Sequence, residues 1–271
     1  MTDSNVQTQA PVRVELGDGG VLRVTLARPQ VRNALDDATI TALGEAFGRR
    51  AHVDDVRCVV LRGEGPAFCA GLDRGTLASL GGADMDRVRE HGPWFQGVIE
   101  AIAECPRPTL AVVQGACVGG GVALLLACDL RIAASDAFFA MMEMRYAFVP
   151  DLGHVHRLQR DVGMARAKEF LFFGERLSAP TLGEWGVLNE VVPPTELDVT
   201  AERWAERLRS APPLAVRAVK RILHAHPGGV DGAASQREAL EANAAGLLGS
   251  DDFREGLTSA MEGRPDRFQG R

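Results

Sequence analysis

The sequence lacks any long hydrophobic run and any excess of positive charge. Its longest apolar run follows Gly121 and stops at Asp129, well short of the roughly 20 residues that a membrane helix needs. The formal net charge of the 271 residues is −6 at pH 7, and the pI is near 5.6. A nucleic-acid-binding surface is basic. We therefore expect neither a membrane nor a nucleic acid as a partner.

Disulfide, metal and nucleotide motifs are also missing. The five cysteines include no Cys-x-x-Cys pair, and an odd count without a signal peptide indicates reduced thiols in the cytoplasm. His154 and His156 are two residues apart, so on a helix they face different directions and do not clamp one metal ion. The sequence has neither a Gly-x-x-x-x-Gly-Lys-Ser/Thr loop nor a strand–Gly-x-Gly-x-x-Gly–helix unit. We expect no metal ion and no tightly bound cofactor.

Two glycine-bearing loops are the most informative features that are present. Residues 67–73 read AFCAGLD after the apolar run 57–62, and residues 115–121 read GACVGGG after the run 109–114. Each run predicts a buried strand that feeds a tight turn, and glycine lets the backbone approach a ligand closely. The apolar residues after Gly121 predict a helix, whose N-terminal N–H groups favour negative charge. Two such N–H sources that face each other would form an oxyanion hole.

The rest of the chain alternates strands and helices before it becomes helical. A helix capped by Asp36 is predicted to run to about His52, and the polar first ten residues are predicted to be disordered. Pro193 and Pro194 mark a seam, because a proline pair does not continue a helix. Strands are predicted over residues 12–16, 21–26, 57–61, 109–113 and 130–133, and helices over 84–104 (with Pro93 as a candidate break), 120–127, 163–173, 197–210, 212–225 and 232–250.

Seven segments in order, covering nearly the whole chain, resemble the crotonase superfamily of enoyl-CoA hydratases and isomerases. Besides the two loops, they are RPQVRNALD at 28–36, CDLRIAA at 128–134, FAMME…PDLG…RL from 139 to 158, AP…EWGVL…VV from 179 to 192, and EG…F from 255 to 268. The resemblance implies an α/β fold in which residues 11–192 form a spiral of repeated ββα turns. It also implies that residues 193–271 form a helical region through which the chain assembles as a trimer or a hexamer.

The resemblance also implies where an acyl-CoA thioester would be activated. The oxyanion-hole donors would be the backbone amides of Leu72 and Gly120, which hold the thioester carbonyl oxygen. Hydratases of this family use two glutamates, and the first position is Ala123 in this chain. Because alanine moves no proton, the pair of glutamates that positions water is missing. The second position is Glu143, which ends an apolar run and should have a raised pKa; without the resemblance it would be read as a surface acid after a strand.

Asp151 lies eight positions beyond Glu143 and follows Pro150. Two branches of the superfamily place a working aspartate at this position: dienoyl-CoA isomerases, which pair it with the glutamate, and chlorobenzoyl-CoA dehalogenases, which use it as a nucleophile. The dehalogenase pattern has tryptophan at the position of Glu143, and the dienoyl isomerase pattern has a further aspartate at that of Ala123. The alternative is that Asp151 caps a helix, a role that suits aspartate.

Residues for the CoA moiety follow from the same motifs. Guanidinium groups suit phosphate oxygens, but the lysines of the hydratase pattern align with Gly75 and Gly263 here, so the phosphate contacts are redistributed. Phe268 is either a stacking partner for the adenine of a neighbouring subunit or an anchor in the core. The CoA- and substrate-binding candidates are Arg28, Arg32, Ala34, Ala70, Asp73, Arg74, Gly119 and Phe268.

Three functions remain open on the sequence. The first is double-bond isomerisation of an enoyl-CoA (Δ3 to Δ2, or dienoyl), because it needs a proton shuttle and no activated water. The second is a hydratase or lyase that works with Glu143 alone, and the third is a non-catalytic acyl-CoA-binding protein. The acyl group is not defined by the single tyrosine and the scattered aromatic residues.

Overall fold

Two sheets form the centre of the computed structural model, which describes residues 10–80, 85–225 and 232–271. The larger sheet has six strands and the smaller has four, and all neighbouring strands are parallel except β1 with β2 and β8 with β9. The order of the larger sheet is β1 (Val12–Leu16), β2 (Val21–Leu26), β3 (Cys58–Gly63), β5 (Thr109–Val113), β7 (Leu130–Ala134) and β10 (Glu190–Val192). The order of the smaller is β4 (Ala67–Cys69), β6 (Ala116–Val118), β8 (Phe138–Ala140) and β9 (Leu177–Ser178).

The chain winds through both sheets in repeated turns. In each turn a strand of the larger sheet is followed by a strand of the smaller sheet and then by a helical segment, as in β3–β4–α2, β5–β6–α4 and β7–β8–η4. The helical segments of these turns are α2 (Arg74–Leu80), α4 (Gly120–Ala127) and the 3-10 helix η4 (Met142–Tyr146). The α/β architecture of repeated ββα turns predicted from the sequence is confirmed.

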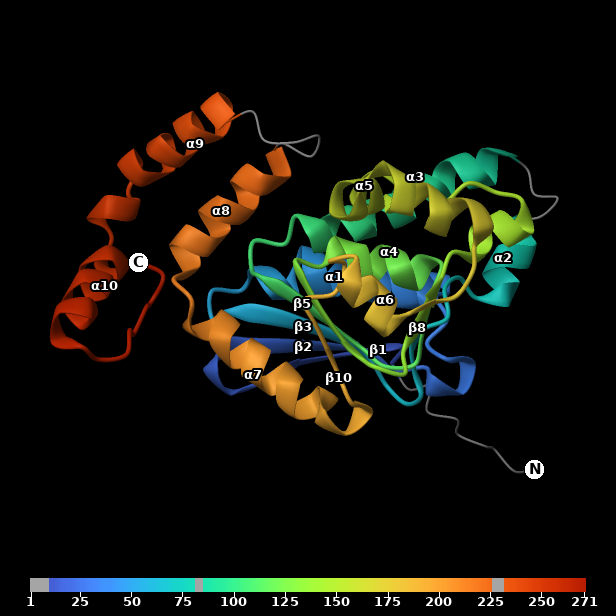
Figure 1. Cartoon of the computed structure of the whole chain (residues 1–271), viewed down its shortest axis with the longest axis horizontal. Helices are drawn as coiled ribbons and strands as arrows, with labels where there is room; N and C mark the ends of the chain where they lie inside the picture. The colour runs from blue at the N-terminus through green and yellow to red at the C-terminus, as the bar shows by residue number, and fades with distance from the viewer. Residues whose placement is uncertain (1–9, 81–84, 226–231) are drawn as a thin grey trace, which may run out of the picture.

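Both faces of the larger sheet are covered by helices, as its apolar strands require. Val59 and Leu61 point into a core shared with α1 (Asp37–Gly48), α3 (Met85–Ala103) and α4. Val60, between them, faces the opposite side and packs with Ala201 of α7 (Leu197–Ser210). In Figure 1, α3, α4 and α5 lie above the sheet and α7 lies below it.

Some predicted helix boundaries differ from the structure. Asp36 does cap α1, since its side chain accepts a hydrogen bond from the Thr39 amide, but α1 ends at Gly48 and a separate 3-10 helix covers Arg50–His52. Pro93 does not break α3, which continues through it. The helix predicted from residue 163 is the second half of α5 (His154–Phe173), whose backbone is non-helical at Gly163.

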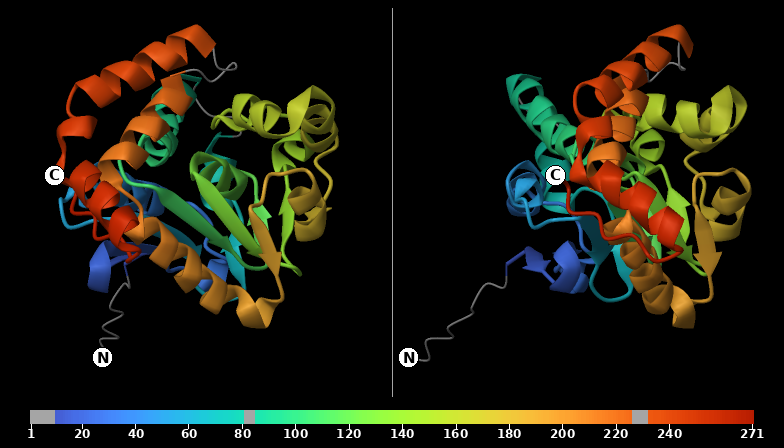
Figure 2. Two further views of the ribbon diagram at one scale, coloured as in Figure 1. Left: turned by 60° about the vertical axis from the view of Figure 1, so that its left-hand side comes forward. Right: turned by 90° about the vertical axis from the view of Figure 1, so that its left-hand side faces the viewer.

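The chain after Pro193 is helical, as predicted, with one error. The helix predicted over residues 232–250 ends at Ala244, and Gly246 (φ +140°) leads into a short 3-10 helix, Leu247–Gly249. The remaining helices are α6 (Ala179–Glu184), before the seam, and α8 (Pro213–Ala225), α9 (Gly232–Ala244) and α10 (Asp251–Glu262), after it. Figures 1 and 2 show that α9 and α10 project away from the sheets. The predicted disordered tail, residues 1–10, lies almost wholly outside the described residues.

A buried arginine closes the C-terminal end of α4. The guanidinium of Arg131, which is 7% exposed, donates to the carbonyl oxygens of Leu125, Leu126, Cys128 and Val187 and lies 2.9 Å from the Asp161 carboxylate. Carbonyls at a helix C-terminus have no intrahelical donors, so Arg131 satisfies groups that would otherwise be buried without partners. The other end of α4, its N-terminus, follows β6 of the smaller sheet directly.

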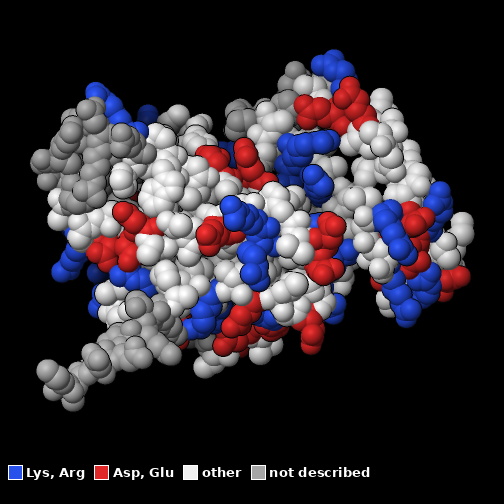
Figure 3. Space-filling view, turned by 180° about the vertical axis from the view of Figure 1, so that it is seen from behind, with Lys and Arg blue, Asp and Glu red and all other residues white. Residues whose placement is uncertain are grey.

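The surface carries both signs of charge. On the face seen in Figure 3, lysine and arginine are interspersed with aspartate and glutamate. Within the described ranges, no helix is long and apolar enough to span a bilayer.

Candidate active site

The two glycine loops meet at the N-terminus of α4. Gly71 has φ +86°, and a Cβ placed there would lie 2.8 Å from the Val118 oxygen and 3.4 Å from the Gly120 nitrogen. Only glycine fits both this conformation and this approach. The structure therefore brings the first loop into contact with the second, as the sequence predicted.

The Leu72 amide points away from the chain that supports it. Leu72 pairs with Leu35 in an isolated parallel bridge, held by hydrogen bonds from the Leu35 amide to the Gly71 oxygen (2.8 Å) and from the Asp73 amide to the Leu35 oxygen (2.9 Å). Since the residues on either side of Leu72 make these bonds, its own N–H is directed the other way. The first amide of α4, that of Gly120, likewise has no acceptor within its helix.

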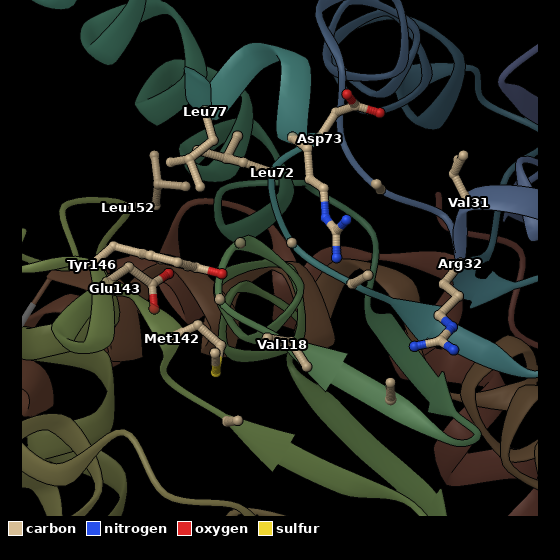
Figure 4. Close-up of a pocket in the computed structure, with 18 of the residues that line it drawn as sticks. Val31, Arg32, Leu72, Asp73, Leu77, Val118, Met142, Glu143, Tyr146 and Leu152 are labelled. Carbon is tan, nitrogen blue, oxygen red and sulfur yellow. The ribbon is translucent and has the colours of Figure 1, made fainter. Parts of the chain in front are cut away.

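A cavity of about 680 Å³ opens beside both amides. In Figure 4, Leu72, Leu77 and Leu152 form an apolar group at one end, close to Glu143 and to Tyr146, whose hydroxyl points into the cavity, while Val31 and Arg32 lie at the other end. The cavity therefore has an apolar end that contains the acid and an opposite end that contains an arginine. Predicted site residues in its lining are Arg32, Ala34, Ala70, Leu72, Asp73, Arg74, Gly119, Gly120, Glu143 and Asp151.

Glu143 is the buried acid of this cavity. It lies in η4, is 7% exposed, and its Oε2 has no hydrogen-bond partner among the described residues. Burial raises the pKa of its carboxyl group to about 7, and the negative charge of Asp151 adds to this rise. The carboxylate lies against the loop, because a Cβ at Gly119 would be 2.8 Å from its Oε1. A carboxyl group with this pKa can both take up and release a proton near neutral pH.

Asp151 lines the same cavity and does not cap a helix. The N-cap of α5 is Gly153, in the left-handed conformation, and no side chain caps it. The helix-cap interpretation of Asp151 is therefore wrong: two residues separate it from the helix that it would have capped. Asp151 as a whole is exposed, but desolvation of its carboxyl group raises its pKa. The second predicted acid thus lies near the first.

The position three residues after Gly120 carries no acid. Ala123 lies in the middle of α4, every residue of which is buried. Among its neighbours, Val122 and Leu124 are apolar core residues.

Arg28 braces the first loop. Its guanidinium lies 3.0 Å from the Asp36 carboxylate and 3.4 Å from that of Asp73, and it donates to the Ala34 oxygen at 2.7 Å. Asp73 also accepts from the Gly75 amide at the start of α2. Arg28 is not among the cavity-lining residues, so phosphate binding by this residue stays a prediction, whereas its contacts hold the loop in shape.

Phe268 lies far along the chain, beside α10. Its ring is next to Gly256, with 3.6 Å to a Cβ placed there, and its backbone oxygen accepts from Arg57. It does not line the cavity of its own chain. These contacts are those of an anchor for the C-terminal segment, and stacking on the adenine of a neighbouring subunit stays a prediction.

Three residues that sequence reasoning did not select for this site belong to it. Tyr146 and Arg176 line the cavity, and the Arg176 guanidinium lies 4.4 Å from the centre of the Phe138 ring. His154 is 1% exposed, and its Nε2 lies 3.0 Å from the Gly119 oxygen. Arg176 is 38 residues from Phe138, and His154 is 35 residues from Gly119. Because each pair is so far apart in the chain, no local sequence pattern predicts either contact.

The fold matches solved enoyl-CoA hydratase structures closely. An enoyl-CoA hydratase from Bacillus anthracis superposes with a TM-score of 0.90 at 31% identity, over 96% of this chain and 100% of that one. One from Mycobacterium smegmatis gives 0.88 at 31% identity, over 95% and 98%. The class defined by this fold is that of the crotonase-fold proteins.

Sequence comparisons place the chain more narrowly. Residues 17–271 match the family model described as "Enoyl-CoA hydratase/isomerase". A protein from Rhodobacter capsulatus named "Probable enoyl-CoA hydratase" is 38% identical over 261 residues, which are 96% of this chain and 98% of that protein. A mitochondrial Delta(3,5)-Delta(2,4)-dienoyl-CoA isomerase from Dictyostelium discoideum is 33% identical over 269 residues, covering 95% and 91%. The chain belongs to the enoyl-CoA hydratase/isomerase family.

Proposed function

We propose that this protein is an enoyl-CoA isomerase that moves a double bond along an acyl-CoA thioester. The observation that carries the proposal is that two acids, Glu143 and Asp151, line one cavity with the two loop residues Leu72 and Gly120, while position 123 in α4 is an alanine. A dienoyl-CoA isomerase is among the relatives at 33% identity, which supports this choice within the family.

The amides of Leu72 and Gly120 would stabilise the charge that develops on the thioester. When a proton leaves the carbon next to the carbonyl, negative charge moves onto the carbonyl oxygen as an enolate forms. Two N–H groups that already face this oxygen stabilise it more in the transition state than in the bound substrate, and each contributes on the order of 3 kcal/mol. The apolar residues Leu77 and Leu152 would surround the acyl chain and exclude water.

The two carboxyl groups would exchange the proton. One carboxylate takes a proton from the carbon beside the carbonyl, the electron pair of that C–H bond enters the conjugated system, and the other carboxyl group returns a proton at the far end. No proton is gained or lost by the acyl chain, and the double bonds shift. The acid that took up the proton then releases it and the other acid regains one by exchange with solvent, which restores the starting state. Because Glu143 has a pKa of about 7, its two protonation states are close in free energy at neutral pH, which suits a shuttle.

Hydration by Glu143 alone is the second candidate function. The relative from Rhodobacter capsulatus, at 38% identity, carries the name of a hydratase. Adding water requires that the water be positioned and deprotonated, and Ala123 supplies no group for this. This candidate predicts an ordered water between Glu143 and the enoyl carbon. A non-catalytic acyl-CoA-binding role is the third, and it predicts binding without turnover.

Turnover of three thioesters separates these functions. Matched 3-enoyl-, 2-enoyl- and 3,5-dienoyl-CoA substrates are offered to the wild type, Glu143→Ala and Asp151→Asn, with Asp136→Asn, an exposed position outside the cavity, as the control. Isomerisation that Glu143→Ala abolishes, Asp151→Asn weakens and Asp136→Asn leaves intact supports the proposal. Hydration without isomerisation overturns it in favour of the hydratase, and binding without turnover overturns it in favour of the binding protein.

The end of the cavity at Val31 and Arg32 would hold the CoA moiety. Arg32, Arg74 and Arg176 are exposed cations in the lining of the cavity as a whole, and guanidinium groups pair well with phosphate oxygens. Of the arginines that the sequence suggested, Arg32 and Arg74 are therefore preferred over Arg28, which already pairs with two carboxylates.

We further propose that the C-terminal helices mediate assembly into a trimer or a dimer of trimers. Apolar side chains on α8 and α10 are exposed in the single chain: Val219 and Leu223 at 55%, Leu257 at 49% and Met261 at 85%. Exposed apolar groups on projecting helices favour burial against another chain.

A further inference from the structure

His154 is a buried side chain that contacts the second glycine loop at Gly119. It is the first residue of α5 and is 1% exposed. Its Nε2 is 3.0 Å from the Gly119 carbonyl oxygen, and its Nδ1 has no partner among the described residues. A carbonyl oxygen only accepts hydrogen bonds, so Nε2 carries the proton and donates. Burial also lowers the pKa of the imidazole to about 4, which leaves it neutral at neutral pH with this tautomer.

The oxygen that His154 contacts belongs to the peptide group that would supply an oxyanion donor. The Gly119 C=O and the Gly120 N–H lie in one planar trans unit and point in opposite directions. Whatever fixes the direction of the carbonyl therefore fixes the direction of the N–H. The Gly119 oxygen also accepts from the amides of Val122 (2.7 Å) and Ala123 (3.2 Å) at the start of α4.

The backbone at Gly119 adopts a conformation that favours glycine. Its φ of +51° and ψ of −118° lie outside the helix that follows, and as a glycine it has no side chain to hinder rotation. The two helical amides approach its oxygen from α4 itself, whereas His154 approaches from α5. His154 thus ties the carbonyl oxygen of this peptide to α5, while the preceding Gly119 amide donates separately to the Ala140 oxygen of β8 at 2.9 Å.

We infer that His154 is a positioning residue. It holds the Gly119–Gly120 peptide group in one orientation and so aims the Gly120 N–H at the thioester oxygen. This inference rests on the proposed acyl-CoA function of the cavity. A donor on the carbonyl side also polarises the peptide group, which makes its N–H a stronger donor. The same Nε2 lies 4.0 Å from Glu143 Oε1, which is beyond hydrogen-bond range. The imidazole therefore lies next to Glu143 and makes no hydrogen bond to its carboxylate.

A matched pair of amide substitutions tests the inference. The side-chain nitrogen of glutamine reaches about as far as Nε2 of histidine, whereas that of asparagine reaches only as far as Nδ1. His154→Gln therefore keeps a donor for the Gly119 oxygen and His154→Asn loses it, while both place a neutral amide in the same site. The probe is hexanoyl-CoA with a ¹³C-labelled thioester carbonyl, whose infrared stretch moves to lower frequency when donors polarise it.

We expect the wild type and His154→Gln to shift the carbonyl stretch of bound hexanoyl-CoA alike, and His154→Asn to shift it less. In turnover, His154→Asn should lose about tenfold or more in kcat, with KM changed by less than about twofold. The reason is that a misdirected donor weakens the stabilisation of the transition state and not the binding of CoA. Melting temperatures of both variants identify losses that come from unfolding.

The inference is overturned if His154→Asn behaves as the wild type, or if both variants lose the infrared shift and kcat equally, which would mark His154 as a packing residue. A wild type that binds hexanoyl-CoA with no infrared shift, or does not bind it, overturns the proposed function and the inference together. A wild type that shifts the stretch but hydrates its substrate overturns only the isomerase assignment, since the same donor serves both reactions.

Discussion

Burial of the Glu143 carboxylate should cost the folded protein stability, and Glu143→Gln should recover it. The carboxyl group has a pKa of about 7 in the folded chain, raised from 4.5 chiefly by desolvation. This rise corresponds to about 3 kcal/mol of differential stability between the two protonation states. Glutamine has nearly the same shape and no charge, so it escapes this cost at every pH.

The sign of the effect depends on pH. Between pH 4.5 and about 7 the folded state binds more protons at this site than the unfolded state, so the wild type loses stability as the pH rises through this window. Above pH 7 the loss is complete, and Glu143→Gln should be more stable than the wild type by up to about 3 kcal/mol. As the pH falls to 4.5 and below, the carboxyl group becomes neutral in both states and the difference should shrink toward zero.

Urea unfolding at pH 8.5 and pH 4.5, read by circular dichroism, measures the two differences. The contribution of the buried His154, whose pKa is lowered to about 4, cancels because both proteins carry it. Glu45→Gln makes the same chemical change at an exposed position of α1 and should leave stability unchanged at both pH values. If Glu143→Gln is no more stable than the wild type at pH 8.5, the carboxylate is not desolvated, and the argument for a proton shuttle loses its physical basis.

Two further substitutions test the framework of the site. Gly71→Ala places a Cβ 2.8 Å from the Val118 oxygen at φ +86°, so it should push the two loops apart and abolish thioester turnover. The control is Gly97→Ala in α3, which has open space around its Cβ position and should leave turnover intact. Steady-state assays compare the two variants. Arg131→Met strips the donors from the C-terminal end of α4 and leaves the buried Asp161 carboxylate paired only with the more exposed Arg160, which should cost about 3–5 kcal/mol in urea unfolding. Arg254→Met, at an exposed ion pair, should cost less than about 1 kcal/mol, and equal losses in the two arginine variants would contradict the reasoning.

The sequence by itself determined five strands of the larger sheet, the two loops and the type of chemistry to look for, whereas β10 and the short strands of the smaller sheet were not predicted. Runs of aliphatic residues ending in glycine identified β3 and β5 and the turns that follow them, because buried strands and left-handed turns each have a local signature. The cap at Asp36 was found for the same reason, since it bonds an amide three residues away. Glu143 was found through a motif, and the apolar run before it correctly indicated a raised pKa.

Only the tertiary structure decided which of these residues contact one another. Arg28 pairs with Asp73 across 45 positions of sequence, and His154 bonds the Gly119 carbonyl across 35. Nothing within a few residues of either partner encodes such a contact, because it depends on how separate turns of the spiral stack. For the same reason the sequence left two roles open for Asp151, a catalytic acid and a helix cap. The helix cap is excluded by the position of Gly153, which is the N-cap of α5, and that position is set by packing.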